Sequence, residues 1–380
     1  MKIDANSVTF EPQDMAFVKK FGILEATEMA LDYHAEHPNL PFLYDAEQLA
    51  GFLGISRGEL NDIVNHIQKE YKEAHLPKKD GTYRSLCVPS IRLRFCQDPI
   101  KEKILPQLPV SKFATAYQKG STTRGNAEPH IGKKFLLKLD ITDFFGSITF
   151  EQVQRTAFNT RYVSRQVGYL LTSLCCKDDS LPQGAATSPA LSNIVMYRFD
   201  DYIGRWCSQR QIAYTRYCDD MTFSANRPLY GVYQKVKTML REMGFELNES
   251  KTHFIGNDNR QSVTGLVVNE KLSIPSGYKR DLRQEVYYAL KFGVEDSVLH
   301  GHRSDFVEDG RPICCPTYML HLMGKVQYVL QIEPENLWFK DAQEKLLAYI
   351  YEHYSESLSY YLHFNKNGKG KGMHEQSNPV

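Results

Sequence analysis

The sequence predicts an α+β protein in which a sheet-bearing central part lies between two helical parts. Apolar residues recur at helical spacing before residue 75 and again after residue 277. Between them, short strand-like runs alternate with turn residues and with two strong helix patterns. Hydrophobic residues make up 42% of the 380 residues, which is enough to build a sizeable core.

Composition limits the possible functions and surroundings. The formal net charge is only +1, so any binding of nucleic acid has to rest on local clusters of charge. The 8 cysteines form no CxxC pair, and the doublets Cys175–Cys176 and Cys314–Cys315 suit neither a disulfide nor a zinc site. Reduced thiols in a cytoplasmic protein are therefore expected.

The N-terminus has no apolar run typical of a secretion signal, and no stretch approaches the roughly 18 apolar residues of a membrane span. Helices are expected across residues 12–75. Ser56 and Glu59 fit a capping box, with Gly54 at the turn before it. The segment also resembles a helix-turn-helix, although two packed amphipathic helices are the favoured interpretation.

The central part begins with a hairpin over residues 78–89, in which Asp80 and Gly81 form the turn. A buried strand follows at residues 133–145, flanked by lysines. Residues 188–206 then form a strong helix, for which Ser188 is the expected N-cap and Pro189 suits the first turn.

The remaining elements follow in a regular order. Residues 212–217 and 221–225 predict a hairpin, and a helix over 229–243 ends before Gly244. Short strands are expected at 245–248, 252–256, 262–269 and 271–275, and helices from 277 to about 364. The tail, residues 365–380, is rich in Gly and Lys and is expected to be disordered.

Three aspartates point to chemistry. Asp219 and Asp220 sit at the turn of the 212–225 hairpin, and Asp140 follows the apolar run of the 133–145 strand. If that strand lies beside the hairpin, Asp140 and Asp219 meet at one end of the sheet. Such carboxylates repel one another unless cations compensate them, and a pair of Mg²⁺ ions suits nucleotidyl transfer. The alternative is that each aspartate is an ordinary turn residue.

Five ordered motifs resemble those of reverse transcriptases: "LKLDITDFFGSI", "LPQGAATSPALSN", "YCDD", "GFELNESKTHF" and "VTGLVVN". The resemblance implies a right-hand polymerase with fingers, a palm made of an antiparallel sheet packed on helices, and a helical thumb. Residues 1–75 would be a helical N-terminal extension, 76–276 the fingers and palm, and 277–364 the thumb and RNA-binding region. Cys218 departs from the small apolar residue that the family more often carries.

The resemblance also implies roles for individual residues. Asp140 and Asp219 would ligate two Mg²⁺ ions together with the backbone of Ile141, and Asp220 would be a weaker ligand. Phe145 would exclude the ribose 2′-hydroxyl and so select dNTPs, and Lys251 would protonate the leaving pyrophosphate. The other residues expected at the nucleotide are Lys79, Arg84, Asp143, Phe144, Gln183 and Gly184.

Two further stretches resemble elements of retron reverse transcriptases: Asn126 to His130 before the first aspartate motif, and Thr264-Gly265 after the last. A retron enzyme binds a cognate structured non-coding RNA, primes from the 2′-hydroxyl of a guanosine and copies part of that RNA into DNA. The product is branched RNA–DNA (msDNA). Such enzymes act in anti-phage defence, here expected with a separate effector protein. Expected RNA contacts are Asn126, His130, Thr264, Gly265, Lys279, Arg280 and Arg283, with stacking on Tyr287, Tyr288 or Phe292.

Three alternatives remain open at this point. Another bacterial reverse transcriptase, such as a group II intron maturase, would normally carry a maturase region and often a zinc-bearing nuclease. A non-catalytic RNA-binding scaffold would not need the aspartates and Gln183. A DNA-binding regulator built on residues 48–64 would leave the central motifs unexplained.

Overall fold

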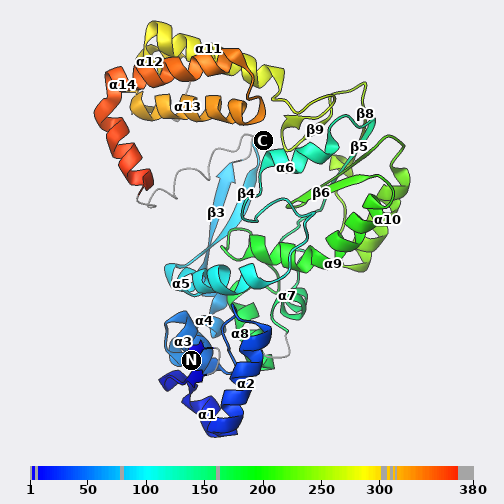
Figure 1. Ribbon diagram of the computed structural model, residues 1–380, viewed down its shortest axis with the longest axis vertical. Coiled ribbons are helices and arrows are strands. Elements are labelled where there is room, and N and C mark those ends of the chain that lie inside the picture. Colours follow the sequence, from blue (N-terminus) through cyan, green and yellow to red (C-terminus); the bar gives the residue numbers. More distant parts are fainter. Residues whose placement is uncertain are drawn as a thin grey trace. The chain divides into compact units, whose positions relative to one another are not determined.

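The structure is a computed structural model that describes residues 2–4, 7–77, 81–159, 163–300, 306–308, 311–312 and 315–366 (Figure 1). The chain divides into two compact units. The first unit comprises Met1–Ser121 and Leu137–Phe254, and the second comprises Thr122–Leu136 and Ile255–Val380. None of the described helices is both long and apolar enough to cross a membrane.

The first unit starts with a helical part, as predicted. Its helices are α1 (Met15–Phe21), α2 (Ile23–Glu36), α3 (Ala46–Leu53) and α4 (Arg57–Asn65). The capping box is confirmed, because Ser56 and Glu59 satisfy each other's backbone N–H groups. Gly54 ends α3 in the left-handed region at φ 74°. A small pair of strands, β1 (Lys2–Asp4) and β2 (Ser7–Thr9), was not predicted.

The predicted hairpin is confirmed and is longer than the sequence indicated. Strands β3 (Tyr71–Pro77) and β4 (Tyr83–Pro89) pair antiparallel over their whole lengths. Its turn residue Asp80 and the expected nucleotide contact Lys79 lie outside the described residues. Helix α5 (Ile91–Pro99) follows, capped by the Ser90 side chain.

The central sheet has four strands in the order β6-β7-β5-β8. They are β5 (Phe135–Asp140), β6 (Ala213–Tyr217), β7 (Asp220–Ala225) and β8 (His253–Gly256). Strand β5 ends at Asp140, earlier than the predicted residue 145. The chain turns there, with Asp143 at φ 42° and the Ser147 N–H bonded to its carbonyl. The predicted strand at 245–248 is wrong, because only one bridge forms there, between Ile141 and Leu247.

Helices support this sheet. Helix α9 (Ser188–Ser208) packs against β6, and α7 (Phe150–Ala157) packs against α9 (Figure 1). Helix α10 (Tyr230–Glu242) is the predicted helix before Gly244, whereas α7 and α8 (Arg165–Cys175) were not predicted. Thr187, not Ser188, is the N-cap of α9, and the Ser188 hydroxyl donates to the Pro182 carbonyl at 2.8 Å.

The second unit is mainly helical. It contains α6 (Thr123–Ala127), β9 (Ser262–Val263), β10 (Leu266–Val267), α11 (Ser276–Phe292), α12 (Val294–His300), β11 (Val307–Glu308), β12 (Arg311–Pro312), α13 (Cys315–Ile332) and α14 (Leu337–Lys366). The predicted C-terminal helices are confirmed, although β11 and β12 interrupt them. The predicted disordered tail lies outside the described residues from 367 onward.

One core explains why residues 122–136 and 255–276 belong with the C-terminal helices, although the sequence placed them with the fingers and palm. Ala127 and Val263 are buried in the same apolar cluster as Leu282 and Val326. The Gly132 N–H also donates to the Val268 carbonyl at 2.9 Å. Segments far apart in the chain therefore share one apolar interior, which sequence periodicity cannot reveal.

Candidate active site

Strand pairing brings the first aspartate to the turn that carries the other two. Asp140 is the last residue of β5, and β5 lies beside β7, which begins at Asp220. The Ile141 N–H donates to the Asp219 carbonyl at 3.3 Å. The predicted meeting of positions 140 and 219 at one end of the sheet is therefore present in the backbone.

Lysine 251 completes this cluster. Asp140 is only 6% exposed, and the Lys251 Nζ lies 2.9 Å from its Oδ2. The short turn Glu249–Lys251 is held in place because the Asn248 N–H donates to the Asp140 carbonyl at 2.9 Å. The ammonium group thus acts as counter-ion to the buried carboxylate.

The cluster carries an excess of negative charge. Loss of hydration and repulsion from Asp140 raise the pKa of Asp219. Although Asp220 is exposed as a residue, loss of hydration at its carboxyl and repulsion from Asp219 raise its pKa to about 6. The hydrogen bond to Asp140 raises the pKa of Lys251, so this side chain is charged at neutral pH. A bound cation would relieve the repulsion.

The donors in this cluster fit a hard divalent cation. Asp140 and Asp219 offer carboxylate oxygens, and the backbone of Ile141 lies between them; oxygen donors of this kind suit Mg²⁺. Over the described ranges, no three His, Cys, Asp or Glu side chains already form a metal-ligating group. Asp219 lies in the turn before β7 and Asp220 begins that strand. The Asp220 carboxyl lies close enough to Asp219 and Asp140 to be repelled by both, so it offers a third carboxylate to the cluster.

The two aromatic residues that follow Asp140, Phe144 and Phe145, differ in how exposed they are. Phe144 is 4% exposed and its ring packs on Phe245, so only its backbone can face a nucleotide. Phe145 is partly exposed. Asp143 is exposed at φ 42°, and its carboxylate lies over Gly146, where a side chain would displace it.

The predicted Gln-Gly motif lies against the β3–β4 hairpin. The Cys87 N–H of β4 donates to the Gln183 carbonyl at 2.7 Å. Gly184 has φ +124°, and a Cβ there would lie 2.8 Å from the Cys87 carbonyl oxygen. Arg84, on the same strand, is exposed. The hairpin and the loop are therefore joined backbone to backbone.

In the second unit, the two retron-like elements contact each other. The Asn126 Nδ2 donates to the Thr264 hydroxyl at 3.3 Å, and Thr264 and Gly265 form the β9–β10 turn with positive φ angles. Asn126 and His130 are 1% and 0% exposed. Both side chains are thus enclosed by protein in this structure, and their contact with RNA stays a prediction.

The cationic side chains of α11 that are expected to bind RNA differ in how accessible they are to a phosphate. The Lys279 Nζ lies 2.6 Å from Glu333 Oε1 in a largely buried ion pair, so it is not available to a phosphate as expected. The Arg283 guanidinium lies over the rings of Trp338 and Phe339. The Arg280 side chain is 80% exposed. The aromatic residues proposed to stack, Tyr287, Tyr288 and Phe292, are exposed.

One buried pair beside the Cys218–Asp219 turn is not among the residues expected from the sequence. Arg216 and Asp200 are both 0% exposed, and the Arg216 Nη1 donates to the Cys218 carbonyl at 2.8 Å. A signal for this pair was present, because an arginine inside a strand and an aspartate inside an apolar helix rarely become buried unless they are paired.

A family model and individual proteins of similar sequence match this chain. A family model described as reverse transcriptase (RNA-dependent DNA polymerase) matches residues 76–268. The retron Mx65 reverse transcriptase of Myxococcus xanthus is 31% identical over 320 residues, which are 78% of this chain and 70% of that protein. The retron Ec86 reverse transcriptase of Escherichia coli is 28% identical over 270 residues, 70% of this chain and 84% of that protein.

Solved structures give a weaker likeness. Telomerase from Candida tropicalis, in complex with a fragment of telomeric RNA, has a TM-score of 0.41 at 12% identity, covering 83% of this chain and 62% of that one. Telomerase from Candida albicans has a TM-score of 0.40 at 14% identity, with 76% and 62% covered.

Proposed function

The chain belongs to the retron reverse transcriptases, which are RNA-directed DNA polymerases of the right-hand fold, and from this premise we propose that it copies part of a cognate structured RNA into DNA by metal-dependent nucleotidyl transfer. The observation that carries the proposal is the pairing of β5 with β7, which sets Asp140 beside Asp219. A scaffold that only binds RNA would gain nothing from carboxylates that repel one another.

Asp140, Asp219 and the backbone of Ile141 would hold the Mg²⁺ ions, with Asp220 as a weaker ligand. Two such ions would stabilise the negative charge on the attacking hydroxyl and on the leaving pyrophosphate. Lys251, which is charged and lies beside Asp140, would give a proton to the pyrophosphate as it leaves.

The surrounding residues would bind and select the nucleotide. Phe145 would press on the sugar, so that a ribose 2′-hydroxyl clashes and a dNTP is preferred. Gln183 and Gly184 would contact the incoming nucleotide, and their bond to β4 would couple them to the Arg84 strand. The Arg84 guanidinium can donate two parallel hydrogen bonds to phosphate oxygens, which suits a triphosphate. Lys79, Asp143 and the backbone of Phe144 would complete this site.

The RNA would supply template and primer together. Priming from a guanosine 2′-hydroxyl within the bound RNA makes initiation effectively intramolecular. Arg280 and the exposed aromatics of α11 are the contacts best placed for phosphates and unpaired bases. Thr264 and Gly265 would contribute to RNA binding through the shape of the β9–β10 turn that they form.

One experiment separates this proposal from its rivals. Nucleic acid bound to the protein would be extracted from its native host and treated with an RNA-debranching enzyme. We expect a branched RNA–DNA molecule with wild-type protein, and RNA alone with Asp219→Ala. DNA that extends an ordinary linear primer would favour a group II intron-like enzyme, and RNA without DNA in both proteins would favour a scaffold.

We further propose that the enzyme acts in anti-phage defence with a separate effector protein, on the basis of its retron family membership. Phage plating efficiency would be compared between hosts that carry the native locus and hosts with Asp219→Ala. Protection that survives loss of DNA synthesis would overturn this part of the proposal.

A further inference from the structure

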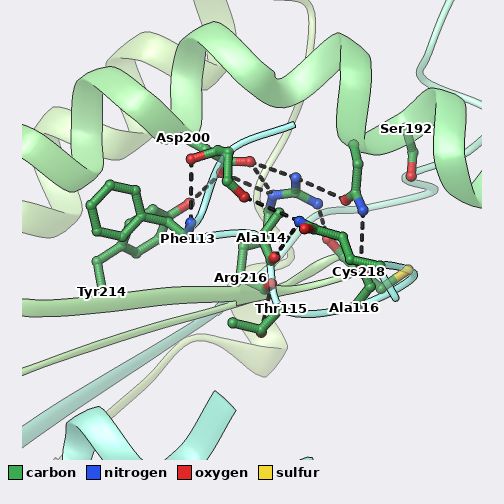
Figure 2. A network of polar contacts seen from close by, with 12 residues as sticks. Phe113, Ala114, Thr115, Ala116, Ser192, Asp200, Tyr214, Arg216 and Cys218 are labelled. Atoms are coloured by element: carbon green, nitrogen blue, oxygen red, sulfur yellow. Dashed lines mark hydrogen bonds and ion pairs between the residues drawn. The ribbon is translucent and has the colours of Figure 1, made fainter. Parts of the chain in front are cut away.

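A buried polar network lies directly beneath the turn that carries Asp219. The Arg216 guanidinium of β6 forks onto the Asp200 carboxylate of α9, with Nε 2.9 Å from Oδ1 and Nη2 2.5 Å from Oδ2 (Figure 2). Both side chains are fully buried. The Tyr214 hydroxyl donates to the same carboxylate at 2.7 Å. Helix α9 and strand β6 are thereby fixed to each other by charge-assisted hydrogen bonds.

The same guanidinium reaches the catalytic turn. Arg216 Nη1 donates to the Cys218 carbonyl at 2.8 Å (Figure 2). Its Nη2 also donates to the Asn193 side-chain Oδ1 at 3.1 Å. Cys218 itself has φ 61°, in the left-handed region that a non-glycine residue adopts only when its surroundings impose it. A fixed carbonyl at Cys218 is one such constraint, and Asp219 is the next residue.

A third segment of the chain joins the network. The Asn193 Nδ2 donates to the Ala116 carbonyl at 2.8 Å, and the Thr115 N–H donates to the Arg216 carbonyl at 2.7 Å. The Tyr117 hydroxyl of this segment reaches the Cys218 Sγ at 3.2 Å. The turn is thus held by Arg216 at the Cys218 carbonyl and by Tyr117 at the Cys218 thiol.

Stability alone does not explain the pair. Burying two charges removes them from water, and an apolar pair of similar volume often packs as well or better. What an apolar pair cannot supply is a donor for the Cys218 carbonyl and for Asn193. The network therefore has a use that depends on its hydrogen bonds and not only on its packing.

We propose that Arg216, held by Asp200 and Asn193, is a positioning residue that fixes the Cys218–Asp219 peptide and so sets the Asp219 carboxylate for metal binding. This inference rests on the proposed function, since it assigns a cause to the geometry of that site. Removing the donor lets the turn relax from its left-handed conformation. Misplacement of a catalytic group by about 1 Å can cost on the order of 100-fold in rate.

The test compares four proteins on a primed RNA template. Asp200→Leu with Arg216→Met removes the charge pair but keeps an apolar filling. Arg216→Lys keeps the charge beside Asp200 but lacks the fork that also reaches the Cys218 carbonyl. The double variant Glu70→Leu with Arg92→Met is the control. It removes a partly exposed charge cluster of the first unit, in which Arg92 pairs with both Glu70 and Asp62 away from the Cys218–Asp219 turn. The wild type is the fourth.

Three quantities are measured: kcat, KM for dNTP, and Mn²⁺ affinity by electron paramagnetic resonance. In both Arg216 variants we expect kcat to fall by about 10- to 100-fold and Mn²⁺ to bind more weakly, while KM for dNTP stays within about threefold. The control is expected to lose stability, as seen in thermal unfolding, without these changes.

Folded Arg216 variants with wild-type kcat and Mn²⁺ affinity would overturn the positioning role. If the apolar double variant does not fold, Arg216→Lys decides, because its ion pair with Asp200 is kept. If the wild type makes no DNA, the proposed function fails. The network is then judged by Mn²⁺ affinity alone, for which equal binding by wild type and Arg216→Lys overturns the inference.

Discussion

At the scale of single residues, the aspartates and Arg216 differ in what the sequence could reveal. The meeting of Asp140 and Asp219 was predictable because one follows and the other precedes a recognisable strand. Two charged residues inside apolar elements indicated the Arg216–Asp200 pair, but the bond from Arg216 to the Cys218 carbonyl was not predictable, because it depends on the packing of α9 against β6. The burial of Asn126 and His130 was not predictable either, since burial is a tertiary property.

Phe145 gives a prediction about sugar selection. Phe145→Ala should raise ribonucleotide incorporation relative to deoxyribonucleotide incorporation by at least about tenfold, because the ring that clashes with a 2′-hydroxyl is gone. The ratio is measured in competition on one template. Phe158→Leu is the control, because that ring is also buried but is not among the expected nucleotide contacts, so the change should affect stability but not the ratio. An unchanged ratio in Phe145→Ala would remove this ring from the sugar site.

His130 gives a prediction about pH. Burial, with Lys133 nearby, lowers the pKa of His130 to about 3 from the ordinary 6.5. Below pH 6.5 His130 binds a proton in the unfolded chain but stays neutral in the native state. The free energy of unfolding therefore falls with falling pH, and the loss is complete near pH 3. At pH 5.5 the loss should be about 1.4 kcal/mol relative to pH 7.5.

This loss is measured by denaturant unfolding at pH 7.5 and 5.5. His130→Gln should lose less stability than the wild type between the two values, whereas a change at the exposed His253, His253→Gln, should leave the wild-type dependence intact. An equal pH dependence in wild type and His130→Gln would show that His130 is protonated in the native state.

At the scale of elements, local signals predicted what local forces determine. The capping box of α4, the glycine stop after α10 and the β6–β7 hairpin all rest on contacts within a few residues. The strand expected at 245–248 failed because strands need a partner, and the chain there makes a single bridge. The N-cap of α9 moved by one residue because Ser188 bonds to Pro182 instead.

The junction of β4 with the Gln-Gly loop gives a prediction at this scale. Gly184→Ala should push the loop from β4, because its Cβ would lie 2.8 Å from the Cys87 carbonyl at a φ of +124°. We expect KM for dNTP to rise by about tenfold or more, with the fold retained. The matched control is Gly231→Ala, where no atom lies within 4 Å of the added Cβ. Equal KM values for dNTP in the two variants would show that the junction of β4 with the Gln-Gly loop does not contribute to nucleotide binding.

At the scale of the whole molecule, the fold class was predictable and the division of the chain was not. Helices at both ends and a sheet between them follow from periodicity along the chain. The inclusion of residues 122–136 in the second unit follows from an apolar cluster shared with the C-terminal helices. Net charge gave no help, because +1 over 380 residues says nothing about where cations gather.

The central claim is that Asp140 and Asp219 together make the chain a metal-dependent polymerase. The most direct measurement is the incorporation of labelled dNTP on a primed RNA template across a Mg²⁺ titration, for wild type, Asp219→Asn and the exposed-site control Asp258→Asn. We predict Mg²⁺-dependent synthesis by the wild type and by Asp258→Asn, and none by folded Asp219→Asn at any Mg²⁺ concentration. Synthesis by folded Asp219→Asn at the wild-type rate would contradict the account.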